Sequence, residues 1–207
     1  RQEEQDGYDL VEWVAKQAWC DGNVGMVGIS YFAMEQLNVA TEQPPHLKAI
    51  FPYDSAGDYY RDWAYDGGIL SMFSFFLWPH FSAKHVMPDA FSRISSAELD
   101  ILIQKAKNNP DIINKPELYN ILINPHQCPT MFDNLVNPTD GPFYWERSVC
   151  KKYDKIKIPA YCGSGWYGYR ICHLSGAFRN YTGLKGPKKL IIGPPVEVDR
   201  PFCQYHD

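Results

Sequence analysis

The chain has 207 residues, of which 45% are apolar and 21% charged, so it can bury the core of one globular domain. A net charge of −4, with only a short basic run at 185–189, argues against nucleic-acid binding. No apolar run is long enough to span a membrane, since serines interrupt the densest one at 69–78. We therefore expect no nucleic-acid partner and no membrane partner.

Six cysteines are present, and none forms the C-x-x-C pair that is typical of zinc sites. Their even number leaves disulfides open, but a chain of this size and apolar content does not need them for stability. We therefore favour free thiols in a cytoplasmic protein, with no metal and no cofactor. Because the chain begins with Arg1 rather than Met, we expect it to be part of a longer protein.

The first third of the chain alternates between helical and strand patterns. Apolar residues recur at helical spacing in 9–18, and 31–42 has a helical pattern as well. Short apolar runs at 24–29 and 47–53 are typical of strands that are buried on both faces. This helix, strand, helix, strand order predicts a parallel sheet with crossover helices.

The pattern changes between 57 and 145. Aromatic residues crowd 59–81, and polar helical stretches such as 95–107 follow, so we expect a helical insertion. Two further strands are predicted at 158–163 and 188–193, on either side of a helix at 168–181.

Ser30 stands between a predicted strand and a predicted helix, the context in which a catalytic serine is lifted above a sheet edge. Gly28 and Ala33 are small enough for the strand and helix to pack closely. The backbone N–H of Tyr31 would face a developing oxyanion. An ordinary helix N-cap is the alternative role for Ser30. Phe32 stands where the G-x-S-x-G motif has its second glycine.

The segments around this serine resemble a known family. The run at 19–26, WCDGNVGM, followed by GISY at 28–31, resembles the X-Pro dipeptidyl-peptidase-like, cocaine esterase-type α/β-hydrolases. In that family the motif around the serine has the pattern G-x-S-Y-x-G, and Ala33 stands at the position of its last glycine. The resemblance continues through 47–63 and 158–167.

The resemblance implies an α/β-hydrolase fold with a mostly parallel sheet. Its core would comprise 1–56 and 146–207, and 57–145 would form an inserted helical cap. It also implies further strands before Arg1 and, in full-length relatives, a β-sandwich that follows the hydrolase domain.

The resemblance further implies a Ser-His-Asp triad, yet two of its positions do not match. Gly168 stands where the family's G-W-Y-D segment has its acid, and Glu197 stands where G-P-W-S-H has its histidine. His206 lies nearest in sequence to the expected loop, so we select it as the candidate base. We interpret His173 as a partly exposed surface residue. Weaker candidates are cap histidines and substitute acids, namely His80, His85, Glu197, Asp199 and Asp207.

These residues predict a serine hydrolase that acts on a small ester or amide. Its catalytic residues would be Ser30 and His206, the oxyanion would be bound at Tyr31, and the substrate would contact Trp166 and Tyr167. The unmatched triad positions favour an alternative, a hydrolase-fold protein that catalyses a non-hydrolytic step or binds a small apolar ligand. A protein-interaction module has no positive feature here, and a homo-oligomer stays open. Hydrolysis should be weak unless a histidine nitrogen lies within about 3.2 Å of Ser30 Oγ.

Overall fold

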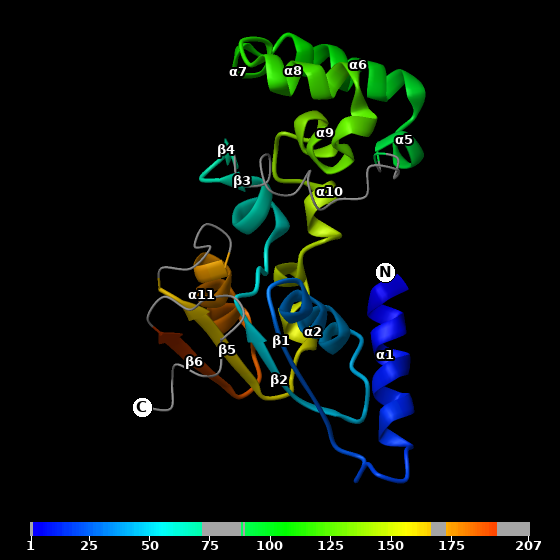
Figure 1. The fold of residues 1–207 in the computed structure, drawn as a ribbon, viewed down its shortest axis with the longest axis vertical. Helices are drawn as coiled ribbons and strands as arrows, with labels where there is room; N and C mark the ends of the chain where they lie inside the picture. Colours follow the sequence, from blue (N-terminus) through cyan, green and yellow to red (C-terminus); the bar gives the residue numbers. More distant parts are fainter. Residues whose placement is uncertain (1, 72–87, 89, 167–172, 194–207) are drawn as a thin grey trace. The chain divides into compact units, whose positions relative to one another are not determined.

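The computed structural model describes residues 2–71, 88, 90–166 and 173–193 (Figure 1). These residues form two compact units. The first comprises the described residues up to Asp66 and from Tyr144 onward, and the second comprises those of Gly67–Phe143. Residues 57–66, which we placed in the insertion, thus belong to the first unit.

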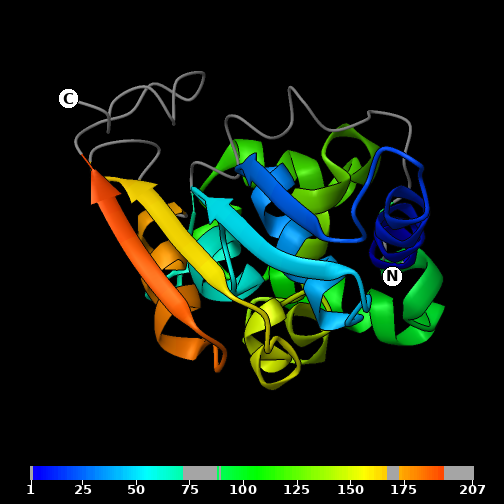
Figure 2. The same ribbon diagram turned by 90° about the horizontal axis from the view of Figure 1, so that it is seen from below.

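A four-stranded parallel sheet forms the centre of the first unit (Figure 2). Its strands, in spatial order, are β1 (Val24–Ile29), β2 (Leu47–Tyr53), β5 (Ala160–Gly165) and β6 (Lys188–Gly193). Ile29 pairs with Tyr53, and Tyr53 pairs with Gly163, so the carboxyl ends of these strands lie level at one edge. The four predicted strands and the parallel sheet are confirmed.

Three longer helices accompany the sheet in the first unit: α1 (Gln2–Ala15), α2 (Tyr31–Thr41) and α11 (His173–Gly183). Helix α2 packs on β1 and β2, α11 packs on β5 and β6, and α1 packs on α2. The shorter elements are the π-helix η1 (Tyr59–Ala64), β3 (Tyr65–Asp66), η3 (Val149–Lys151) and η4 (Tyr153–Lys155).

The sheet, α1 and α2 all contribute residues to the core of the first unit. Leu37 and Val39 of α2, with Leu47 and Ile50 of β2, are almost completely buried there. The sequence prediction that β1 is buried on both faces is wrong, because Val27 is 62% exposed. Side chains alternate along a strand, so Val27 points to the opposite face from the core residues.

The second unit is built from short helices. Their bounds, after β4 (Ile69–Leu70), are α5 (Ala90–Arg93), α6 (Ser96–Lys107), α7 (Pro110–Ile113), α8 (Pro116–Ile123), η2 (Pro125–Gln127) and α9 (Pro129–Val136). Helix α10 (Pro142–Trp145) contains the boundary between the two units in the sequence. Proline opens α7, α8 and α9, because a first helical residue needs no N–H donor. Phe132 and Met131 are buried at the centre of this unit. Its role as a cap stays a prediction.

Candidate active site

Ser30 occupies the tight turn between β1 and α2. Its φ of 58° and ψ of −117° lie outside the regions that residues with a side chain normally adopt. The Ser30 N–H donates to the Tyr53 carbonyl at 3.0 Å, and its own carbonyl accepts from Ala33 and Met34. A Cβ at Gly28 would lie 2.8 Å from Phe32 Cβ, so only glycine allows this approach of strand and helix. The predicted position of Ser30 between a strand and a helix is confirmed, and the backbone there is strained.

The Ser30 side chain does not cap the helix that follows it. Although Ser30 is the N-cap residue of α2, its hydroxyl makes no capping hydrogen bond. Instead, Ser30 Oγ lies 3.2 Å from Nε2 of His173, which is 143 residues away in the sequence. The hydroxyl is therefore placed against an imidazole, as nucleophilic catalysis requires.

His173 is a buried residue, with 7% of its surface exposed. The sequence interpretation of His173 as a partly exposed surface residue is therefore wrong. We expected a helix over 168–181, which would place His173 one turn inside it. The described part of α11 comprises His173–Gly183, and residues 168–172 of the expected helix lie outside the described residues. The contact with Ser30 Oγ places His173 beside the Ser30 turn.

The surroundings of His173 keep its ring neutral. Burial lowers the pKa of His173 below its usual value, and the charge of the Asp54 carboxylate opposes this shift only in part. The neutral ring can accept the Ser30 proton at Nε2 when Nδ1 carries the ring proton. Nδ1 is buried, and no hydrogen-bond partner for it exists among the described residues.

Asp54 lies at the same edge of the sheet, directly after β2. It is 4% exposed and has a φ of 52°, in the left-handed region. Its Oδ1 accepts hydrogen bonds from Ser164 Oγ at 2.7 Å and from the Gly165 N–H at 3.2 Å. We did not select Asp54 from the sequence. The available signal was an acid that directly follows the strand after the serine motif.

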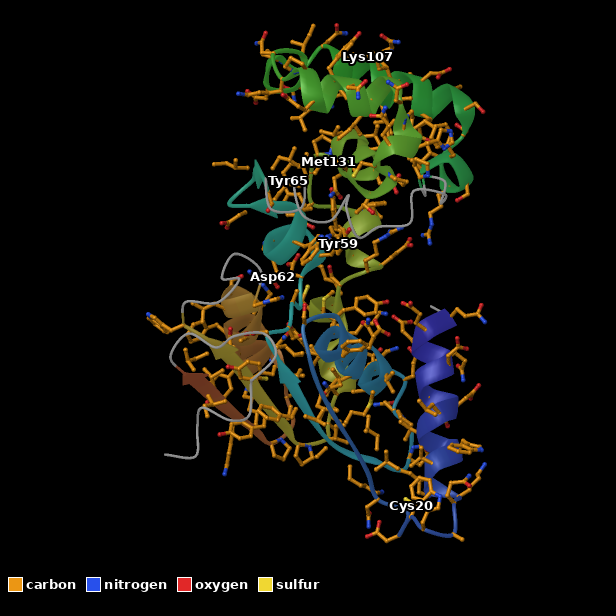
Figure 3. All side chains as sticks on the ribbon, in the orientation of Figure 1. Cys20, Tyr59, Asp62, Tyr65, Lys107 and Met131 are labelled. Atoms are coloured by element: carbon orange, nitrogen blue, oxygen red, sulfur yellow. The ribbon has the colours of Figure 1, made fainter. Side chains whose placement is uncertain are left out.

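A second buried carboxylate, Asp62, holds the helix that carries His173. Figure 3 labels Asp62 on the π-helix η1, which follows β2. Its Oδ1 accepts from Ser175 Oγ at 3.2 Å and from Arg179 Nε at 3.0 Å, both on α11. Its Oδ2 accepts the backbone N–H groups of Gly57 and Asp58. Asp62 therefore joins the start of α11 to the segment after Asp54.

Close packing reinforces this junction. A Cβ at Gly176, one turn into α11, would overlap the Ser55 carbonyl and lie 2.8 Å from Ala56 Cα. Only glycine lets α11 approach the 55–56 backbone this closely. Two neighbours of the candidate dyad, α11 and the segment after β2, are thus fixed to each other.

The other site residues predicted from the sequence lie apart or outside the described residues. Tyr31 is the first residue of α2, and N–H groups of a first helical turn have no acceptor within their helix. Its hydroxyl donates to Glu3 on α1. Trp166 follows β5 and is 47% exposed. The candidates outside the described residues are Tyr167, Gly168, His80, His85, Glu197, Asp199, His206 and Asp207.

Other features of the described residues bear on the sequence predictions. No helix among them is both long enough and apolar enough to cross a membrane. No three of their His, Cys, Asp or Glu side chains are grouped as metal ligands. Free thiols occur at Cys20, Cys128, Cys150 and Cys162, whereas Cys172 and Cys203 lie outside the described part of the chain.

Comparison with known proteins gives consistent matches over most of the chain. The family model described as X-Pro dipeptidyl-peptidase (S15 family) matches residues 1–196. Cocaine esterase from Rhodococcus sp. (strain MB1 Bresler) is 28% identical over 93% of this chain and 34% of its own length. The chain thus spans about a third of that relative.

Solved structures agree with this match. A CocE/NonD family hydrolase from Staphylococcus aureus has a TM-score of 0.61 at 29% identity, over 93% of this chain and 28% of the other. An α-amino acid ester hydrolase has a TM-score of 0.65 at 18% identity, over 93% and 31% of the two chains. These structures are α/β-hydrolases, and the fold predicted from the sequence is confirmed.

Proposed function

The chain belongs to the X-Pro dipeptidyl-peptidase (S15) family, and we propose that it acts as a serine hydrolase in which His173 is the general base for Ser30. The observation that carries this proposal is the 3.2 Å contact between Ser30 Oγ and His173 Nε2. It meets the distance criterion for a general base. His206, the base proposed from the sequence, lies outside the described residues and is the competing candidate.

The geometry supports a two-step acyl transfer. In the first step the Ser30 proton moves to His173 Nε2 while Oγ forms a bond to the substrate carbonyl carbon. The negative charge that develops on the carbonyl oxygen would be stabilised by the Tyr31 N–H at the start of α2. The imidazolium then returns its proton to the leaving alcohol or amine as the carbonyl carbon releases it.

The second step uses the same residues with water as the nucleophile. His173 Nε2 accepts a proton from water, whose oxygen attacks the acyl carbon, and then returns that proton to Ser30 Oγ. The product is a carboxylic acid, and Ser30 is restored. Both steps need a histidine that is neutral between turnovers, which the lowered pKa of His173 provides.

We propose a small ester or amide as the substrate, with an ester as the first compound to test. The support is the family and the similarity to an enzyme named for its action on an ester. Trp166, exposed directly after β5, is proposed to contact the substrate together with Tyr167. The free thiols among the described cysteines support the proposed cytoplasmic location.

A fluorophosphonate probe tests this function, because it reacts covalently with activated serines. We expect the full-length protein to be labelled rapidly and Ser30→Ala not to be labelled. Intact-mass analysis would report a single adduct, and digestion would place it on Ser30. A wild-type protein that resists the probe would contradict the proposal. The non-hydrolytic or ligand-binding alternative would then stand.

A further inference from the structure

The buried ring of His173 needs a nearby negative charge when it is protonated during catalysis. Its Nδ1 is buried without a partner among the described residues, yet the ring must become an imidazolium in every catalytic step. A buried cation without a compensating charge is strongly disfavoured. The family's acid position holds Gly168, so the compensating charge must come from another element.

Asp54 is the group that meets this need. It is the carboxylate whose charge acts on His173, and it is almost completely buried. It directly follows Tyr53, whose carbonyl accepts the Ser30 N–H at 3.0 Å. Because Ile29 pairs with Tyr53, Ser30 and Asp54 are the next residues of two adjacent strands at the same edge.

The conformation of Asp54 also points to a role beyond packing. A φ of 52° is unfavourable for a residue with a side chain, and strained residues of this kind are common at functional sites. Ser164 and Gly165, at the end of β5, hold Oδ1 through two hydrogen bonds. These hydrogen bonds fix the position of the carboxylate.

The neighbouring carboxylates are engaged elsewhere. Asp58 is paired with Arg61 at 2.9 Å, and Asp62 is paired with Arg179 at 3.0 Å. Each of these negative charges is balanced by a guanidinium. Asp54 carries no ion pair among those found for the described residues, so its charge is available to a histidine that becomes protonated.

We propose that Asp54 is the positioning residue of His173 and takes over the part of the acid that the family places at Gly168. This inference rests on the proposed function. Asp54 exchanges no proton in this role. Through its charge it stabilises the imidazolium that forms when the Ser30 proton moves to Nε2.

Two substitutions remove the charge in different ways. Asp54→Asn keeps an oxygen that can accept from Ser164 and Gly165, so only the charge is lost. Asp54→Gly suits the φ of 52° and removes the carboxylate without backbone strain. Asp58→Asn is the matched control, because it neutralises another buried carboxylate that follows the same strand.

Two readouts separate a positioning role from a structural one. The first is an NMR titration of the His173 ring, whose signals are assigned by their loss in His173→Gln. We expect both Asp54 variants to lower the pKa of His173 and Asp58→Asn to leave it in place. The second is the pH profile of ester hydrolysis, in which kcat should fall at least about tenfold and KM should stay nearly constant. The acid limb of that profile should move to lower pH.

A failure of the Asp54 proposal can be distinguished from a failure of the proposed hydrolase function. If the pKa of His173 and kcat are unchanged in a folded Asp54 variant, the role of Asp54 is refuted while the Ser30–His173 dyad can still stand. If the wild-type protein is not labelled at Ser30, the hydrolase proposal fails, and the NMR titration still decides whether Asp54 acts on His173. Asp54→Gly serves if Asp54→Asn does not fold.

Discussion

Arg179 donates from Nε to Oδ1 of Asp62 at 3.0 Å, and the Asp62 side chain in this ion pair is fully buried. The same carboxylate accepts the backbone N–H groups of Gly57 and Asp58. One buried group thereby ties α11 to the segment that follows β2. This connection holds the helix that carries His173.

Removing that carboxylate should destabilise the protein strongly. Asp62→Ala leaves two backbone donors and Arg179 without their acceptor, and breaking a buried ion pair costs about 3–5 kcal/mol. Urea denaturation followed by circular dichroism would measure the change. Asp66→Ala, at an exposed position, is the control and should shift the midpoint little. A loss of less than about 1 kcal/mol for Asp62→Ala would be inconsistent with this description.

Gly176→Ala should force α11 away from the chain that it packs against. The added Cβ would overlap the Ser55 carbonyl, which is backbone and cannot rotate aside. We expect a loss of about 1–3 kcal/mol in stability and slower labelling of Ser30. Gly141→Ala is the control, because its nearest neighbour would lie 3.7 Å away. Equal stability of the two variants would argue against close packing at Gly176.

The strain at Ser30 should appear as a difference between two substitutions that both remove the hydroxyl. Ser30→Gly tolerates a φ of 58°, whereas Ser30→Ala retains the strain. We expect the glycine variant to be more stable than the alanine variant by about 1 kcal/mol, with neither labelled by the probe. Thermal unfolding of the pair measures this difference, and an alanine variant that is the more stable would contradict it.

The strands and the serine turn were predictable because their signals are local. A continuous apolar run such as 24–29 predicts a buried strand. The residues of the serine motif, Gly28, Ser30 and Ala33, are close together in the sequence. The outward position of Val27 was missed, since the number of covered faces is a property of the assembled sheet. The individual short helices of the second unit were not predicted, and Pro110 and Pro116 begin two of them.

The partner of Ser30 was not predictable for a different reason. His173 lies 143 residues from Ser30 in the sequence, and no local pattern links two side chains at that separation. Asp54 and Asp62 show the same limit. Their neighbours Ser164 and Arg179 lie more than a hundred residues away in the sequence, so only the folded sheet edge brings them together.

Stability should depend on pH through His173. Because burial lowers its pKa, the unfolded chain binds more protons than the folded one between the folded pKa and the ordinary value of about 6.5. The free energy of unfolding should therefore rise with pH across that window, and the penalty is fully present below it. His173→Gln should remove this slope, as urea titrations at several pH values would show. An unchanged slope would mean that His173 titrates normally.

The most direct test of the central claim is the second-order rate constant with which a fluorophosphonate labels Ser30 in His173→Gln. If His173 is the base, this rate should fall at least about a thousandfold from that of the wild-type protein. His46→Gln is the matched control, because His46 precedes β2 and is paired with Glu12, so its rate should match the wild type. A His173→Gln protein that is labelled at the wild-type rate would contradict the assignment and return the role of base to His206.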